Sequence, residues 1–168
     1  CPELKGHRKG EALYTEKLPF LRNIVTVGFD MEGALNWDEM LDKGREIPLE
    51  EVWRRSSLVK ADDVCNMQYT SGTTGFPKGV MLTHRNIVNN GKTIGDRMDM
   101  STADRMMIQV PMFHCFGMVL SMTSMMTHGG TLCPIPYFSP KSSLACITEE
   151  NITCLNGVPT MFVALFSH

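Results

Sequence analysis

The stretch Tyr69–Gly79, with the sequence YTSGTTGFPKG, contains the residue types and spacing in this chain that are best suited to chemistry. Its three glycines let the backbone turn tightly, so that successive N–H groups can point into one concavity and hold phosphate oxygens. Ser71, Thr73 and Thr74 add hydroxyl donors, and Lys78 adds a mobile positive charge that can meet negative charge developing there. The pattern therefore predicts an anion-binding loop.

This loop differs from the phosphate-binding loop of the P-loop NTPases. That motif requires G-x-x-x-x-G-K-[ST], whereas Lys78 stands between Pro77 and Gly79. P-loop phosphoryl transfer is therefore not expected. The residues alone leave a second interpretation open, a solvated turn between two strands, because Gly, Ser and Thr are common in such turns.

His114 is the second residue with chemical potential, and its surroundings are apolar. It lies within residues 106–140, which contain no Lys, Arg, Asp or Glu. A lone histidine in such a stretch is usually a core residue with satisfied hydrogen bonds, and this interpretation stands beside a chemical one. A further histidine, His84, is expected in the first turn of a helix.

The elements that must position these residues alternate between strands and helices. We expect strands at 21–27, 64–70, 106–110, 131–135 and 152–155, and helices at 37–43, 50–56, 117–126 and 159–166, with two further helices beginning after Thr83 and at Ser139-Pro140. Thr83 is expected to cap the helix that follows it, with Ile87, Val88, Ile94 and Met98 on one face, while Leu144 and Ile147 face inward on the helix that begins at Ser139-Pro140. The alternation predicts an α/β fold with a parallel or mixed sheet.

Composition excludes several classes of protein. The chain has 168 residues, 43% of them hydrophobic and 20% charged, which is typical of one folded domain. A net charge of −2 gives no global positive field for nucleic acid, and the apolar region is too interrupted for a transmembrane segment. Six scattered cysteines without a C-x-x-C pair are expected to be buried free thiols, which favours the cytoplasm.

Three segments together resemble the motifs of the adenylate-forming (AMP-binding) enzymes, which include acyl-CoA synthetases, luciferases and peptide-synthetase adenylation domains. The run Tyr69–Asn86 resembles the signature loop of that family. Residues 111–117 (PMFHCFG) resemble its histidine-aromatic motif, and residues 157–161 (GVPTM) resemble the strand-to-helix segment that follows. Their order and spacing agree with the family as well.

The resemblance implies the layered α/β N-terminal domain of such an enzyme, with a parallel or mixed sheet flanked by helices. Residues 1–168 are then a single fragment of that domain, with 1–60 as a variable lead-in and 61–168 as the core. The small C-terminal domain is expected to lie outside the chain. The 168 residues alone are not expected to make acyl-adenylate, because proximity and orientation need the other walls of the site.

The implied reaction is a two-step ligation. A carboxylate attacks the α-phosphate of ATP, pyrophosphate leaves, and the thiol of coenzyme A captures the acyl-adenylate, with Mg²⁺ lowering the cost of the developing charge. A fatty acid is the expected substrate, because the Thr73-Thr74 variant, FHCFG and VPTMF resemble fatty-acyl ligases. Two alternatives remain open, an aryl- or amino-acid adenylating enzyme and a noncatalytic module that binds ATP phosphates. The oligomeric state is not predicted.

The resemblance also assigns roles to particular residues. The phosphate contacts are Thr70, Ser71, Gly72, Thr73, Thr74, Gly75 and Lys78. Thr74 is in addition the expected metal contact, and Lys78 and His114 are the expected catalytic residues. The acyl pocket is expected to include Phe113, His114, Phe116 and Gly117. His114 would orient the carboxylate or stabilise the transition state by donating a hydrogen bond.

Overall fold

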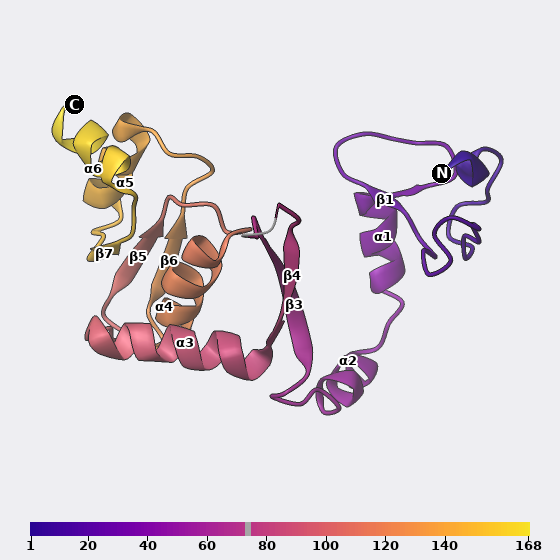
Figure 1. Cartoon of the computed structure of the whole chain (residues 1–168), viewed down its shortest axis with the longest axis horizontal. Coiled ribbons are helices and arrows are strands. Elements are labelled where there is room, and N and C mark those ends of the chain that lie inside the picture. Colours follow the sequence, from indigo (N-terminus) through magenta and orange to yellow (C-terminus); the bar gives the residue numbers. More distant parts are fainter. Residues whose placement is uncertain (73–74) are drawn as a thin grey trace. The chain divides into compact units, whose positions relative to one another are not determined.

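The structure is a computed structural model that describes residues 1–72 and 75–168 (Figure 1). The chain divides into two compact units, Cys1–Val59 and Lys60–His168. Each unit is described by itself below.

The first unit has little regular structure. Its elements are η1 (Pro2–Leu4), β1 (Val25–Thr26), β2 (Leu35–Asn36), α1 (Trp37–Gly44) and α2 (Leu49–Ser56), and β1 pairs with β2 in parallel. The strand expected at 21–27 is thus only two residues long. The reason is local, because the Leu21 amide closes a turn onto the carbonyl of Leu18 and the carbonyl of Arg22 accepts from the Leu13 amide. These backbone groups are therefore not available for a longer strand ladder.

The second unit begins with a β-hairpin followed by a long helix. β3 (Val64–Thr70) runs antiparallel to β4 (Lys78–Thr83), and Thr70 pairs with Lys78 at the end where the loop joins the two strands. α3 (His84–Arg97) follows at once because Thr83 caps it. The Thr83 hydroxyl accepts from the Asn86 amide at 3.2 Å, and the Asn86 side-chain oxygen accepts from the Thr83 amide at 3.0 Å. The expected cap at Thr83 is confirmed.

A three-stranded parallel sheet forms the centre of this unit. Its order is β6 (Thr131–Pro134), β5 (Arg105–Ile108) and β7 (Cys154–Leu155), followed in the chain by α6 (Pro159–Phe166), while α5 (Pro140–Glu149) connects β6 to β7. β5 pairs in parallel with both neighbours, so the predicted α/β class with parallel strands is confirmed. Ser139 caps α5 by accepting from the Ser142 amide at 3.1 Å, as expected.

The helix expected at 117–126 is present but is wound differently. It consists of a π-helix, η2 (Phe116–Thr123), followed by a single turn, α4 (Ser124–Met126). η2 and α4 contact α3 on one side and the sheet on the other, which makes them the middle layer of the unit (Figure 1). The buried core between η2–α4 and the sheet contains Met100, Met106, Ile108 and Met125.

The buried face of α3 corrects an expectation. Gly91 and Gly95 are its buried residues, whereas Val88 and Met98 are exposed and Ile87 is half-buried. Glycines occupy this face because a Cβ on Gly91 would lie 2.7 Å from Cγ2 of Thr123. The close approach of α3 to η2 therefore excludes larger side chains at the positions where periodicity alone expects them.

Two further expectations about burial are wrong. On α5 the buried residue is Ser143, and Leu144 is exposed, since a hydrogen bond to Gln109 fixes the inward position. The six cysteines are free thiols as expected, but Cys1, Cys65 and Cys115 are exposed and the other three are half-buried. Among the described residues, no helix has the length and apolar character needed to cross a membrane.

Candidate functional site

The anion-binding loop joins the two strands of the hairpin, and its backbone has the geometry that the glycines predict. Gly72 has a φ of +63° and Gly75 a φ of +84°, conformations that side chains with a Cβ rarely adopt. A Cβ on Gly72 would also collide with the carbonyl oxygen of Phe76. Gly72 is therefore required by a close approach as well as by its φ. Thr73 and Thr74, including the metal contact expected at Thr74, lie outside the described residues.

The side chains around this loop are open to solvent. Thr70, Ser71 and Lys78 are exposed, and Thr70 faces Lys78 across the hairpin. Among the ion pairs formed by the described residues, none uses Lys78. The positive charge of Lys78 is thus available to an anionic ligand at the end of the loop, and the turned backbone at Gly72 fits the approach of a phosphate group.

His114 lies in the segment that leaves the carboxyl end of β5. Its amide closes a turn onto the carbonyl of Pro111 at 3.2 Å, and its own carbonyl accepts from the Met118 amide at the start of η2. The Phe116 amide donates to Nδ1 of His114 at 3.1 Å. A backbone N–H is always a donor, so Nδ1 accepts, and the neutral imidazole carries its proton on Nε2. His114 is exposed and therefore presents an N–H donor at the surface.

An apolar cavity of about 280 Å³ lies between the hairpin, α3 and the start of η2. Its lining residues are Gln68, Thr70, Val80, Leu82, Asn86, Ile87, Asn90, Cys115, Val119 and Leu120. Thr70 is the last residue of β3 before the loop, and Cys115 directly follows His114. The structure therefore brings the loop and the histidine motif, 44 residues apart in sequence from Thr70 to His114, to the same cavity.

A second cavity, of about 470 Å³, opens at the carboxyl ends of β5 and β6. Phe113 lines it together with Ile108, Val110, Tyr137, Phe138 and Met161. Of the other expected pocket residues, Phe116 is half-buried and Gly117 is buried against the backbone of Pro111, where a Cβ would collide with the Pro111 carbonyl. The motif is thus divided between two cavities, with Phe113 at one and the residue after His114 at the other.

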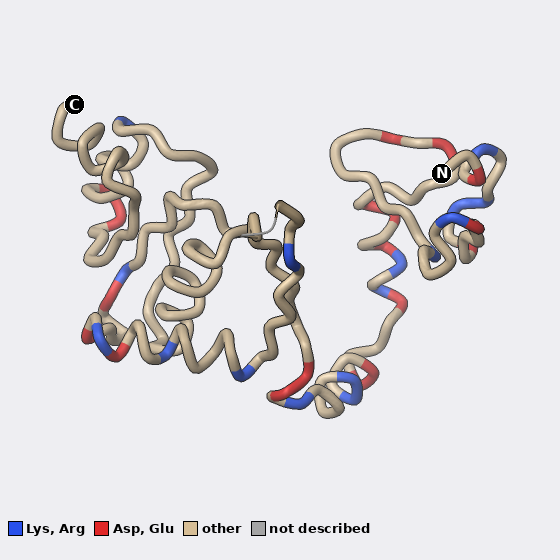
Figure 2. The backbone as a smooth tube through the Cα atoms, viewed as in Figure 1, with Lys and Arg blue, Asp and Glu red and all other residues tan. Residues whose placement is uncertain are grey.

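The largest apolar part of the second unit is free of formal charge. Residues 106–140 contain no Lys, Arg, Asp or Glu, and Figure 2 shows β6, η2 and α4 without coloured residues. The carboxylates whose pKa is lowered lie elsewhere, at Glu39, Glu51, Asp62, Asp96 and Asp104. Asp62 is an example, since a hydrogen bond from Arg85 at 2.7 Å lowers its pKa and ties the start of β3 to α3. These groups support the fold.

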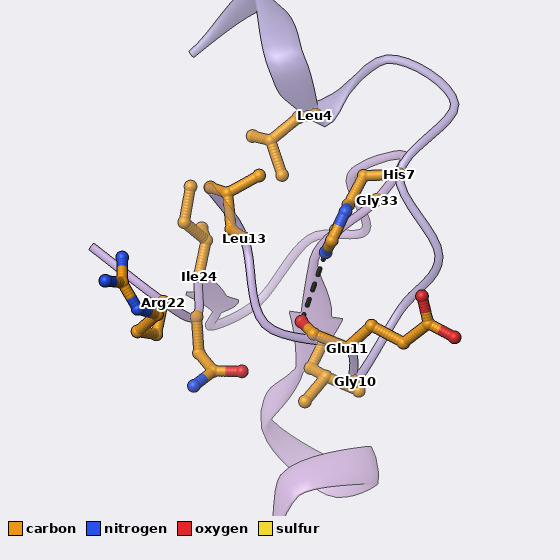
Figure 3. Close-up of a pocket in the computed structure, with 10 residues that line it drawn as sticks. Leu4, His7, Gly10, Glu11, Leu13, Arg22, Ile24 and Gly33 are labelled. Atoms are coloured by element: carbon orange, nitrogen blue, oxygen red, sulfur yellow. Dashed lines mark hydrogen bonds between the residues drawn. The ribbon is translucent and has the colours of Figure 1, made fainter. Parts of the chain in front are cut away.

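The first unit contains a cavity of comparable size, about 240 Å³, but its lining, Gly28, Phe29, Asp30, Asn36, Trp37 and Asp38, includes two acidic side chains and no basic one. The hollow lined by Leu4, His7, Leu13 and Gly33 holds about 10 Å³, which is less than a water molecule usually needs (Figure 3). His7 there faces the carbonyl of Glu11 at 3.2 Å. No group of three or more metal-ligating side chains is found in the parts of the chain that the structure describes.

Sequence reasoning missed several residues around the site. Gln68 and Asn90 line the 280 Å³ cavity, and Ser121 and Asn156 form hydrogen bonds beneath the histidine motif. Asn156 carried a weak signal, its position directly between an expected strand and the GVPTM segment. Ser121 carried none, since a single serine in an apolar helix has many possible roles.

Comparisons with known proteins agree with this arrangement. The family model described as AMP-binding enzyme matches residues 14–168. The chain is 40% identical over 173 residues to the mitochondrial medium-chain acyl-CoA ligase of Rattus norvegicus, covering 99% of this chain and 28% of that protein. It is 40% identical over 154 residues to an acyl-CoA ligase of Ajellomyces capsulatus, covering 91% of this chain and 26% of that protein.

A solved structure shows the same likeness in three dimensions. O-succinylbenzoate coenzyme A synthetase from Bacillus subtilis, in complex with ATP and magnesium ion, matches with a TM-score of 0.60 and 30% identity, covering 66% of this chain and 23% of that chain. The chain spans between 25% and 30% of the length of its first curated relatives.

Proposed function

Since the chain belongs to the AMP-binding enzyme family, we propose that the protein activates a carboxylic acid with ATP and transfers the acyl group to coenzyme A. The observation that supports this most directly is the shared cavity, which Thr70 lines from the loop side and Cys115 from the histidine side. The cavity thus lies between the start of the loop and the end of the histidine motif, an arrangement that suits a reaction between a phosphate and the carboxylate of an apolar acid. The 168 residues would form part of the large N-terminal domain of this enzyme.

In the first step a carboxylate oxygen attacks the α-phosphorus of ATP, and the bond from that phosphorus to the bridging oxygen of pyrophosphate breaks. The products are acyl-adenylate and pyrophosphate. The loop from Thr70 to Lys78 binds the departing β- and γ-phosphates, with Gly72 allowing the backbone to approach them and Lys78 offsetting their charge. In the second step the sulfur of coenzyme A attacks the acyl carbon and AMP leaves.

His114 acts in the first step as a donor. With Nδ1 accepting from the Phe116 amide, the Nε2 proton is directed at the ligand rather than shared with the chain. A donated hydrogen bond holds the carboxylate in line with the phosphorus and stabilises the negative charge of the transition state. A proton on both nitrogens would break the bond from Phe116, so this orientation belongs to the neutral ring.

The apolar walls of the cavity favour a fatty acid. The 280 Å³ space is lined by Val80, Leu82, Ile87, Val119 and Leu120, and none of its lining residues offers a charged partner for an amino group. Burying an unpaired ammonium there would be costly, so an amino-acid substrate is the less favoured alternative. A relative of this chain is named a medium-chain acyl-CoA ligase, which agrees with an aliphatic acid.

ATP, Mg²⁺ and coenzyme A are the expected small-molecule partners. The bacterial synthetase with a similar fold contains ATP and magnesium ion, and the relatives are named acyl-CoA ligases. The described residues supply the phosphate cradle at Gly72 and the charge of Lys78, and Mg²⁺ would add charge neutralisation when bound with ATP. Thr74, proposed as a metal contact, lies outside the described residues.

Six free thiols suit a reducing compartment such as the cytoplasm.

The test is carboxylate-dependent exchange of labelled pyrophosphate into ATP by the full-length protein. Fatty, aromatic and amino acids are compared in parallel. We expect exchange with fatty acids, and a rate about 100-fold lower in Lys78→Ala because the positive charge that offsets the developing negative charge on pyrophosphate is lost. Lys141→Ala, which removes an equally exposed lysine from α5, is the matched control and should exchange at the wild-type rate. Exchange with amino acids alone would reject the proposal that the substrate is a fatty acid. If the protein binds ATP but catalyses exchange with no acid, the proposal that it is an adenylate-forming enzyme would be rejected.

A further inference from the structure

A chain of polar groups runs beneath the histidine motif from the end of β7 to the start of η2. The side-chain amide of Asn156 donates to the carbonyl of Leu120 at 3.2 Å and to Oγ of Ser121 at 3.0 Å. Oγ of Ser121 in turn donates to the carbonyl of Phe116 at 3.2 Å. Ser121 is completely buried, while Asn156 and Phe116 are half-buried, so these bonds are partly protected from water and help to define the position of Phe116.

Phe116 connects this chain to His114. Its carbonyl is held by Ser121, and its amide donates to Nδ1 of His114 at 3.1 Å. Both backbone groups flank one α-carbon, so a shift of the carbonyl moves the amide as well. The orientation of the imidazole and the location of its proton therefore depend on Ser121 and, through Ser121, on Asn156.

The helix geometry explains why such support is needed. η2 is an eight-residue π-helix, a form that is rare and occurs mostly as single turns near functional sites. Its serine and threonine side chains donate back to its carbonyls, as Thr123 does to Met118 at 2.8 Å. Asn156 adds a donor to Leu120 from outside the helix. The wide winding at Phe116 is thus stabilised by side chains rather than by the backbone ladder alone.

A separate branch of the same polar cluster supplies a control. The carbonyl of Asn156 accepts from Nε2 of Gln109 at 3.1 Å, and Oε1 of Gln109 accepts from Oγ of Ser143 at 3.0 Å. Ser143 is as completely buried as Ser121. It lies on α5, however, and among the described residues its side-chain hydrogen bonds lead to Phe116 only through Gln109 and Asn156.

We infer that Ser121 and Asn156 are positioning residues for His114, which fix its ring orientation and hold its proton on Nε2 through Phe116. This role rests on the proposed function, in which the Nε2 proton is donated to the carboxylate. The two residues touch no reacting atom. Their effect is to fix the direction of the His114 Nε2–H donor, so that the imidazole does not have to reorient when the substrate binds.

The experiment compares three variants of the full-length protein. Ser121→Ala and Asn156→Ala remove the chain to Phe116, and Ser143→Ala removes an equally buried hydroxyl from the other branch. The first readout is the ¹⁵N spectrum of the histidine rings, which reports the tautomer, with the His114 signal assigned by its loss in His114→Ala. The second readout is the kcat and KM of ATP–pyrophosphate exchange.

We expect the His114 signal to move from the Nε2–H tautomer toward a mixture in Ser121→Ala and Asn156→Ala. The kcat of exchange should fall about tenfold with the KM for ATP unchanged, because the variants lose the orientation of the His114 donor and not the binding of ATP. Ser143→Ala should keep the tautomer and the kcat. In a His114→Ala background, Ser121→Ala should have no further effect.

A wild-type tautomer in Ser121→Ala, or an equal change in Ser143→Ala, would overturn the inference. Should Asn156→Ala fail to fold, Ser121→Ala decides the question, since it deletes a single oxygen. If the wild-type protein exchanges with no acid, the proposed function fails, and the tautomer comparison alone still decides whether Ser121 positions His114.

Discussion

The two halves of the candidate site are built in different ways. The loop after β3 depends on local backbone geometry, with Gly72 at a φ of +63° in a hairpin whose ends, Thr70 and Lys78, are paired. His114 depends in addition on a residue far away in sequence, because Asn156 bonds Ser121, which holds the backbone to which the His114 ring is bonded. One half is therefore specified by neighbours in sequence and the other by neighbours in space.

This difference suits the two tasks. A loop that contacts phosphates with its amides and one lysine can adapt to its ligand, since each contact is separate. A single donor aimed at a reacting carboxylate tolerates little misplacement, because a shift of about 1 Å can cost 100-fold in rate. In the proposed mechanism the polar chain under His114 would provide that rigidity, and the exposed hairpin would not need it.

The largest expected effect on the exchange rate comes from a substitution in the loop after β3, which leaves the His114 side of the site unchanged. Gly72→Ala places a Cβ against the Phe76 carbonyl at a φ that disfavours any side chain. We expect ATP–pyrophosphate exchange to fall by about 100- to 1,000-fold, because the loop amides no longer converge on the phosphates. The His114 tautomer should remain that of the wild type.

The control for this variant is Gly28→Ala in the first unit. Gly28 also has a positive φ, +80°, but a Cβ there meets nothing within 4 Å. It should cost about 1–2 kcal/mol of stability from backbone strain and leave exchange unchanged. A changed tautomer in Gly72→Ala would show that the two halves are not independent.

The same contrast explains which parts of the fold could be predicted from the sequence. The strand at Val64–Thr70, the cap at Thr83 and the helix at Pro159–Phe166 follow local signals and agree with the structure. The π-helix and the inward position of Ser143 do not, because they depend on partners such as Asn156 and Gln109. Periodicity identifies an apolar helix, but it does not indicate its winding.

The site follows the same rule. The glycine-rich loop is visible as a motif, and the structure gives Gly72 the positive φ that the motif requires. That Thr70 and Cys115 meet at one cavity requires the packing of the hairpin, α3 and η2, which no local pattern describes. The buried Gly91 and Gly95 are an example, since only contact with Thr123 and His128 explains them.

An intermediate effect is expected at the contact that holds the two halves together. In Gly91→Ala the new Cβ would lie 2.7 Å from Cγ2 of Thr123, which forces α3 and η2 apart. We expect a loss of about 1–3 kcal/mol in the free energy of unfolding, measured by urea denaturation. Asn89→Ala, at an exposed position of the same helix, should be neutral or slightly stabilising because alanine has the higher helix propensity. Equal stability of Gly91→Ala and the wild type would contradict this packing.

The smallest effect is expected at the amino ends of β5 and β7, opposite to the end where Asn156 lies. A second group of polar residues there contains an ionisable side chain, Asp104. Asp104 accepts from the Thr153 hydroxyl at 2.8 Å and from the amide and hydroxyl of Ser101, and these bonds lower its pKa. A lowered pKa in the folded state contributes stability above the unfolded value of about 4, and the contribution is lost as the pH falls through the folded value. The Ser121–Asn156 chain contains no such group and should not respond to pH in this range.

Asp104→Asn tests this contrast. The amide retains one acceptor oxygen, so the variant should unfold at a lower urea concentration than the wild type at pH 7. The difference between the two midpoints should shrink as the pH falls below about 4, because the wild-type carboxylate becomes protonated and loses its advantage. Thr153→Val removes the hydroxyl donor to Asp104. Its urea midpoint should therefore also depend less on pH than the wild-type midpoint does. A midpoint difference that stays constant across this pH range would show that Asp104 acts through its shape alone, and both ends of the sheet would then be held by bonds that do not titrate.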